Sequence, residues 1–133
     1  MKPVVQKHPF GCAIACVAHV LGIRYDNALT LFRNGSRKAK NEGFYCRDII
    51  KTLGNSYYYF YVKDRKRKLI YREGTIVYIR KSKKHPAGHY LAKTPDGWMD
   101  PWINFPENKD IRDAKAGIRK RLPGKAMYTI TPK

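Results

Sequence analysis

The chain has 133 residues, of which 43% are hydrophobic, and its 28 Lys and Arg against 10 Asp and Glu give a net charge of +18. This length suits one domain with its own apolar core, and the composition excludes a disordered tail. No stretch approaches the roughly 18 apolar residues that a membrane span needs, and the N-terminal arm lacks the apolar run of an export signal. Three cysteines, an odd number, do not form a secreted disulfide framework, so we expect a cytoplasmic protein.

The first half of the chain is predicted to be helical. Apolar residues recur at helical spacing over about residues 12–21, and Gly22 stands where a glycine ends a helix. A second helix is expected to start with Asp26 as its cap and to end near residue 34. The polar segment 36–43 is then expected to be a loop, and a third short helix is expected over 46–53.

The second half is predicted to form strands, because its segments are rich in β-branched and aromatic residues and are separated by Gly, Pro and Asp. The sequence "TPDGW" predicts a tight hairpin turn. The stretch 107–122 is ambiguous and is interpreted as an exposed helix interrupted at Gly117. Helices followed by strands predict an α+β fold with N-terminal helices packed on a mostly antiparallel sheet. The expected strands are 57–62, 75–81, 88–94, 97–100 and 126–131.

Cys12 stands at the predicted start of the first helix, directly after the segment Pro9-Phe10-Gly11. The free N–H groups and the dipole at a helix N-terminus favour a thiolate, so Cys12 is a candidate nucleophile. Cys16 lies one turn further on, where a small apolar residue suits the core. The competing interpretation makes Cys12 a buried structural thiol as well, since free cysteines are commonly buried.

A thiolate that attacks a carbonyl needs a proton shuttle, which a histidine paired with a carboxylate supplies. His89 begins a predicted strand, and Asp100 ends the partner strand across the turn, so hairpin geometry predicts that the two side chains meet. Asp96 competes for the second role, but the Pro-Asp-Gly turn already explains that residue. The amide of Gln6 and the backbone N–H of Cys12 are candidate donors to an oxyanion.

The order Gln6, Cys12, "AIACVAHVLG" and later "GHYLAKTPDGWMDP" resembles the papain-like cysteine peptidases of the bacteriocin-processing type. Those domains remove double-glycine leaders at the N-terminus of peptide-exporting ABC transporters. The resemblance implies a papain-like fold in which Cys12 is the nucleophile, His89 the general base and acid, Asp100 the orienting carboxylate and Gln6 the oxyanion-hole side chain. The implied reaction is hydrolysis of a peptide or isopeptide bond, or a related acyl transfer, on a peptide or protein substrate without a cofactor. This chain has Gly11 and Ala13 where that family usually has an acidic residue and a glycine.

A zinc site is an alternative use of the cysteines. Cys12, Cys16 and His19 are spaced so that they share one side of a helix, and with Cys46 they would make four ligands. Zinc sites usually take ligand pairs from a knuckle or hairpin rather than three ligands from one helix, so a metal-free site is favoured.

Basic residues are concentrated in three runs, 63–68, 80–85 and 118–125, with tyrosines near the first. Aromatic side chains beside cations suit single-stranded nucleic acid, through base stacking and phosphate contacts. The chain is therefore also compatible with a non-catalytic, nucleic-acid-associated protein on the same scaffold. The remaining interpretation is a solvated lysine-rich surface without a polyanionic partner.

Overall fold

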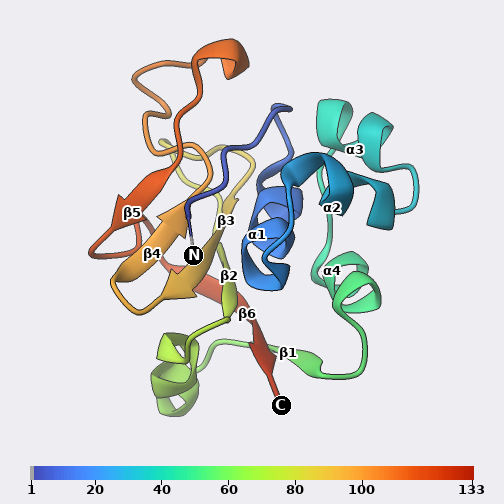
Figure 1. Ribbon diagram of the computed structural model, residues 1–133. Coiled ribbons are helices and arrows are strands. Elements are labelled where there is room, and N and C mark those ends of the chain that lie inside the picture. Colours follow the sequence, from blue (N-terminus) through green and yellow to red (C-terminus); the bar gives the residue numbers. More distant parts are fainter. Residues whose placement is uncertain (1) are drawn as a thin grey trace.

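The computed structural model describes residues 2–133, the side chains of 64–66 excepted, and confirms the α+β class: helices come first and pack on an antiparallel sheet (Figure 1). The helices are α1 (Cys12–Leu21), α2 (Tyr25–Leu31), α3 (Gly35–Asn41) and α4 (Cys46–Leu53). The strands are β1 (Tyr57–Tyr61), β2 (Ile76–Ile79), β3 (His89–Thr94), β4 (Gly97–Asp100), β5 (Gly117–Arg119) and β6 (Ala126–Pro132). Among the described residues, no helix is long and apolar enough to cross a membrane.

The sheet has the order β1-β6-β2-β3-β4-β5, and every neighbouring pair is antiparallel. The last strand along the chain, β6, lies between β1 and β2, so the C-terminal segment is an interior strand of the sheet. The predicted turn at Pro95-Asp96 joins β3 to β4, with Thr94 and Gly97 paired across it. This hairpin sets the relative positions of His89, at the first residue of β3, and Asp100, at the last residue of β4.

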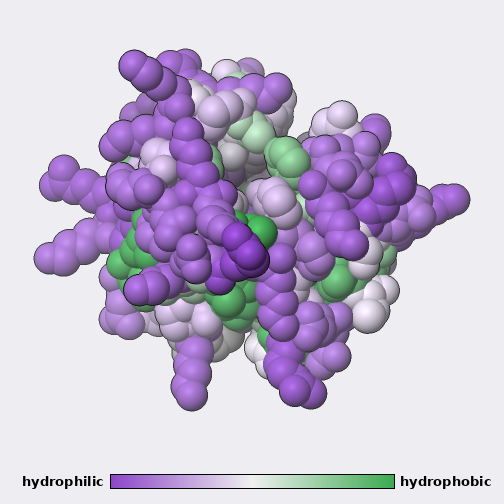
Figure 2. All heavy atoms as spheres, turned by 90° about the horizontal axis from the view of Figure 1, so that it is seen from above, coloured by the Kyte–Doolittle hydropathy of each residue, from purple (hydrophilic) through white to green (hydrophobic). Residues whose placement is uncertain are grey.

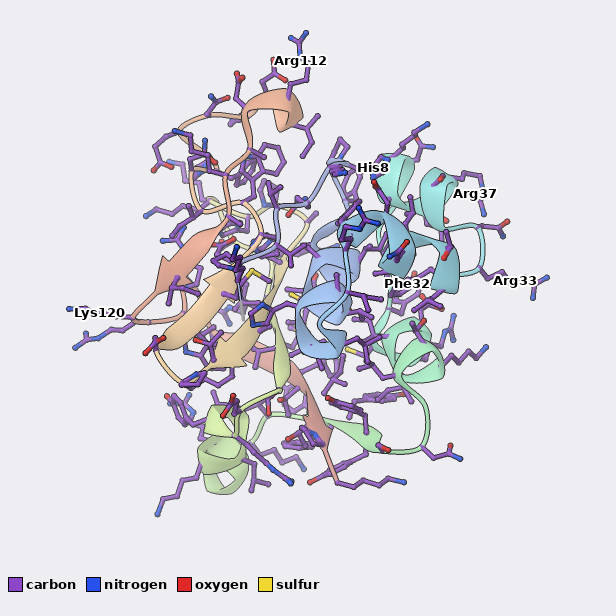
Figure 3. The ribbon with its side chains drawn as sticks, viewed as in Figure 1. His8, Phe32, Arg33, Arg37, Arg112 and Lys120 are labelled. Atoms are coloured by element: carbon purple, nitrogen blue, oxygen red, sulfur yellow. The ribbon has the colours of Figure 1, made fainter. Side chains whose placement is uncertain are left out.

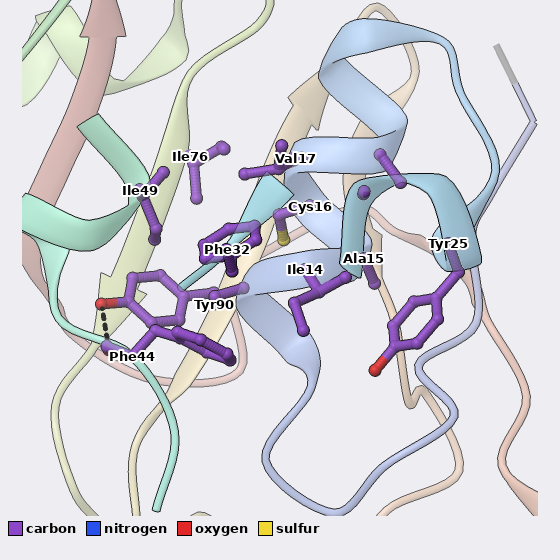
Figure 4. Packing of buried hydrophobic residues seen from close by; sticks show 14 of the residues in the cluster. Ile14, Ala15, Cys16, Val17, Tyr25, Phe32, Phe44, Ile49, Ile76 and Tyr90 are labelled. Atoms are coloured by element: carbon purple, nitrogen blue, oxygen red, sulfur yellow. Dashed lines mark hydrogen bonds between the residues drawn. The ribbon is translucent and has the colours of Figure 1, made fainter. Parts of the chain in front are cut away.

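Helix α1 is the central element of the apolar core. Its residues from Ala13 to Ala18 are at most 1% exposed, because one side of the helix packs on β3 and the other on α2 and α4. Figure 4 shows Ile14, Cys16 and Val17 of α1 facing aromatic and aliphatic side chains of the sheet and of the neighbouring helices. Gly22 ends the helix in the left-handed conformation with φ of 69°, as predicted.

The two faces of the sheet are buried by different layers. Successive strand residues point to opposite faces, so Tyr90 and Met99 belong to the core under the helices, whereas Leu91 and Trp98 belong to a second apolar cluster on the other face. That second face is covered by Ile70 of a 3-10 helix, Asp64–Tyr71. Hydrophilic side chains cover most of the molecular face seen in Figure 2.

Three predictions about local structure were wrong. Residues 36–41 are not a loop but most of α3, which starts at Gly35 after Asn34 adopts a left-handed φ of 55°. Asp26 does not cap α2; it lies inside the first turn and forms an exposed ion pair with Lys7 at 3.0 Å. The stretch 107–122 is not an exposed helix. It contains a single 3-10 turn, Ile111–Asp113, and the edge strand β5.

The core makes a quantitative prediction about α4. Ile49 has 0% exposure and packs beneath the helix, so Ile49→Ala is expected to lower the free energy of unfolding by about 2–5 kcal/mol through lost burial and a residual cavity. Leu31→Ala in α2 is the matched control, because Leu31 is 50% exposed and its truncation is expected to cost less than about 0.5 kcal/mol. Urea unfolding of the two variants checks this, and equal losses would contradict the assignment of Ile49 to the core.

Candidate active site

Cys12 is the first residue of α1 and is half-buried. The residue before it, Gly11, is the N-cap, and a Cβ atom there would overlap the hydroxyl of Tyr25. The Tyr25 hydroxyl is itself hydrogen-bonded to Nδ1 of His8, at 2.8 Å. A side chain at position 11 would therefore have to displace the Tyr25 hydroxyl, so the chain enters the helix in close contact with α2.

His89 and Asp100 meet as the hairpin geometry predicts. His89 Nε2 donates to Asp100 Oδ1 over 2.7 Å, and the two side chains are 7% and 0% exposed. The Cys12 thiol interacts with the same imidazole. Because Nε2 is engaged by the carboxylate, Nδ1 is the ring nitrogen left for the sulfur. The structure thus brings Cys12, His89 and Asp100 together in one chain of contacts.

The buried carboxylate of Asp100 has three donors from different segments. Besides His89, Arg119 Nε donates to Oδ2 at 2.6 Å, and the backbone N–H of Trp102 donates to Oδ1 at 2.9 Å. A second nitrogen of Arg119 donates to the Ile103 carbonyl at 3.0 Å, which fixes the guanidinium. Sequence reasoning missed this residue, because Arg119 lies in a basic run that was interpreted as a surface feature. Its place in a three-residue edge strand carried no recognisable signal.

The electrostatics of the pair are set by competition between burial and charge. Burial disfavours the protonated ring of His89, but the Asp100 carboxylate and the Cys12 sulfur outweigh it and raise the pKa of His89 to about 10. Burial also disfavours the ionised form of Asp100, but the hydrogen bonds from His89, Arg119 and the Trp102 N–H hold the pKa of this carboxyl well below its usual value. The arrangement therefore stabilises the protonated form of His89 beside the Cys12 sulfur.

A second histidine, which the sequence offers as a candidate but does not favour over His89, stacks on the first. His85 is 3% exposed, and its ring stacks on that of His89 with centroids 4.9 Å apart and planes 8° apart. Burial, and then the neighbouring His89, lower the pKa of His85 to about 4, so this ring is neutral at pH 7. Phe105 packs against both His85 and Trp102, at centroid distances of 5.4 and 4.9 Å. The rings of His85, Phe105 and Trp102 thus pack together next to the His89–Asp100 pair.

Gln6 lies close to the same site, but its side-chain amide already donates to other groups. It is 2% exposed, and its backbone N–H donates to the carbonyl of Pro101, directly after Asp100. Its side-chain nitrogen donates to the carbonyls of His8 and Pro9, at 3.0 and 3.2 Å. The Gln6 amide therefore ties the N-terminal arm into the turn before α1, and it would have to release one carbonyl to hold an oxyanion.

The other cysteines do not join Cys12 in a metal site. Cys16 is buried in the core, and burial raises its pKa well above the ordinary value. The Cys46 sulfur lies 3.7 Å from the Tyr90 hydroxyl, and His19 Nδ1 is paired with the Lys2 carbonyl. Across the described residues, no group of three or more His, Cys, Asp and Glu side chains is placed to hold a metal ion.

No protein-family model, no curated protein and no solved structure matches this chain. A function for the protein therefore has to follow from the side chains around Cys12.

The Arg119 contact predicts a large loss of stability. In Arg119→Gln the buried Asp100 carboxylate loses its charged partner, so the free energy of unfolding is expected to fall by about 3 kcal/mol. Arg112→Gln is the matched control, since it removes an ion pair whose arginine is 85% exposed, and its stability is expected to stay near that of the parent. Urea unfolding measures both; an Arg119→Gln variant as stable as Arg112→Gln would refute the anchoring role.

The His89–Asp100 pair also predicts a pH dependence, which is cleanest in a Cys12→Ala background where no thiol titrates beside the ring. The Asp100 carboxylate raises the folded-state pKa of His89 above its unfolded value of 6.5, so the contribution of the pair is complete below that pH and is lost as the pH rises. The free energy of unfolding of Cys12→Ala is expected to fall as the pH rises above about 6.5, more steeply than in Cys12→Ala with His89→Gln. Parallel curves for the two variants would argue against the pairing.

Proposed function

We propose that the protein is a thiol-dependent peptidase, or a related acyl transferase, acting on a peptide or isopeptide bond through Cys12, His89 and Asp100. The observation that carries the proposal is one buried imidazole that donates a hydrogen bond from Nε2 to the Asp100 carboxylate and interacts with the Cys12 sulfur. A cysteine buried only for packing has no need of this imidazole and carboxylate, which are the two partners that nucleophilic catalysis by a thiol requires.

In the proposed mechanism, the Cys12 thiol has already given its proton to His89 in the resting enzyme, and Asp100 stabilises the imidazolium that results. The thiolate attacks the substrate carbonyl, and the tetrahedral intermediate collapses when His89 returns the proton to the leaving amine. Water, deprotonated by His89, then attacks the thioester and releases the acid and the thiol. Asp100 stays ionised throughout, because its three hydrogen-bond donors hold its pKa low.

The oxyanion is assigned first to the backbone N–H of Cys12. The first N–H groups of an α-helix have no partner within the helix, so the start of α1 offers a donor beside the reacting sulfur. Gln6 is the proposed second donor, after rotation of its amide away from one of the two carbonyls that it now contacts. The order of these residues agrees with the resemblance to papain-like peptidases of the bacteriocin-processing type, which favours a peptide substrate.

Alkylation by iodoacetamide tests the nucleophile directly. At neutral pH Cys12 is expected to react at least about 10-fold faster than a free cysteine, because His89 takes its proton, and peptide mapping identifies the labelled residue. His89→Ala is expected to reduce the rate to that of a free thiol. Asp96→Asn is the control: this side chain belongs to the β3–β4 turn, and the variant is expected to label like the parent.

Cleavage of a peptide library then tests the reaction. The parent protein is expected to cleave members of the library, whereas Cys12→Ala is expected to leave them intact. Slow labelling of Cys12 in the parent, at the rate of a model thiol, would contradict the proposed function. Rapid labelling without any cleavage would restrict it to acyl transfer to an acceptor other than water.

A further inference from the structure

A second concave region lies on the face of the sheet opposite α1. Two adjoining hollows of about 390 and 290 Å³ share Val62, Arg67, Lys125 and Ala126, so together they form one continuous groove. Its floor includes Ile70 and Trp98, which belong to the apolar cluster on that face of the sheet. Cys12, in contrast, packs against the cluster on the helix face. The groove is therefore separate from the proposed catalytic site.

The groove is positively charged along its length. Its walls contain six basic side chains, and among the side chains that the structure describes no carboxylate lines it. Figure 3 shows Lys120 pointing away from the body of the molecule at the end of β5, on the side opposite the helices. The basic lining residues are Lys63, Arg67, Arg80, Lys120, Arg121 and Lys125. Six of the 28 Lys and Arg residues of the chain thus line this groove, which favours an anionic ligand.

Aromatic rings accompany these cations. Tyr71 is 60% exposed and lies edge-on to Trp98, with ring centroids 6.1 Å apart. Tyr61, at the other end of the groove, is 53% exposed and is held edge-on by Tyr128 at 5.6 Å. The ring of each tyrosine is therefore held by a neighbouring aromatic ring, and enough of its surface is exposed for a planar ligand to stack on it.

We propose that this groove binds single-stranded nucleic acid. Phosphates contact the lysines and arginines of the walls, and unpaired bases stack on Tyr61 and Tyr71 over the apolar floor. An acidic peptide satisfies the charge but has no regularly spaced planar groups for the exposed rings, and a duplex keeps its bases stacked inside the helix. The combination of cations, exposed rings and a concave floor therefore fits an unpaired strand best.

Fluorescence anisotropy with the full chain and a labelled 15-nucleotide oligo(dT) tests the proposal. We expect saturable binding that weakens with salt, and Lys120→Gln with Lys125→Gln is expected to raise Kd about 10-fold and to reduce the slope of log K against log salt by about 1.4. Tyr71→Leu keeps the apolar bulk but removes the ring, and is expected to raise Kd about 5-fold.

The control carries the same loss of charge on the helix side of the molecule. Arg33 and Lys51 are exposed, and Figure 3 shows Arg33 pointing away from the helices on the side opposite Lys120. Arg33→Gln with Lys51→Gln is expected to bind oligo(dT) within about 2-fold of the parent, because these charges lie outside the groove. A comparable loss in this control would show that net charge alone attracts the strand, and would overturn the proposal.

Three other results would also overturn it: no binding at physiological salt, tighter binding of a duplex of the same length, or tighter binding of a poly-glutamate peptide. Unchanged thermal unfolding of each variant establishes that a loss of affinity arises at the groove. Binding is measured without any thiol chemistry and is expected to persist in Cys12→Ala. Failure of this proposal and failure of the proposed catalytic function are therefore distinguishable.

Discussion

The buried carboxylate of Asp100 is the contact on which the rest of the site depends. It accepts hydrogen bonds from His89 on β3, from Arg119 on β5 and from the backbone of Trp102 in the following turn. A carboxylate with 0% exposure would be unstable alone, and these three donors compensate its lost hydration. The same three bonds fix the imidazole, hold the edge strand to the sheet and turn the chain after β4. The geometry of the proposed catalytic site and the local stability therefore have a common origin.

The fold places the two proposed sites on opposite faces of one sheet. Under the helices, α1 brings its first residue, Cys12, to the start of β3, where His89 lies. On the opposite face the sheet carries Trp98 at the floor of a basic groove. Both proposals depend on the period-two alternation of the strands, which sends neighbouring residues such as Trp98 and Met99 to opposite layers. A nucleic-acid strand bound in the groove would thus leave the thiol, on the other face of the sheet, accessible.

Local sequence signals were sufficient for the elements with strong periodicity. The bounds of α1 and α4, the β3–β4 hairpin and the fold class follow from apolar spacing, terminal glycines and one Pro-Asp-Gly turn. The meeting of His89 and Asp100 was predictable because a short hairpin fixes it. The resemblance to papain-like peptidases and the catalytic role remain predictions, since no known protein tests them.

The missed features depend on contacts that are distant along the chain. Arg119 was interpreted as part of a surface run, because only the pairing of β5 with β4 turns its side chain toward Asp100. His85 stacks on His89 only because of how the segment between β2 and β3 folds, and no local sequence pattern indicates that contact. Helix α3 was missed because its polar sequence has no apolar stripe; only Gly35 and Ala39 are buried in it.

The most direct measurement of the central claim is the protonation state of His89. Nitrogen-15 NMR of the imidazole reports which ring nitrogens carry protons as the pH is raised. The contacts with Asp100 and Cys12 predict that the ring stays doubly protonated well above its ordinary pKa of 6.5, and that Asp100→Asn shifts its titration to lower pH. A ring that titrates near 6.5 in both proteins would contradict the coupling of sulfur, imidazole and carboxylate.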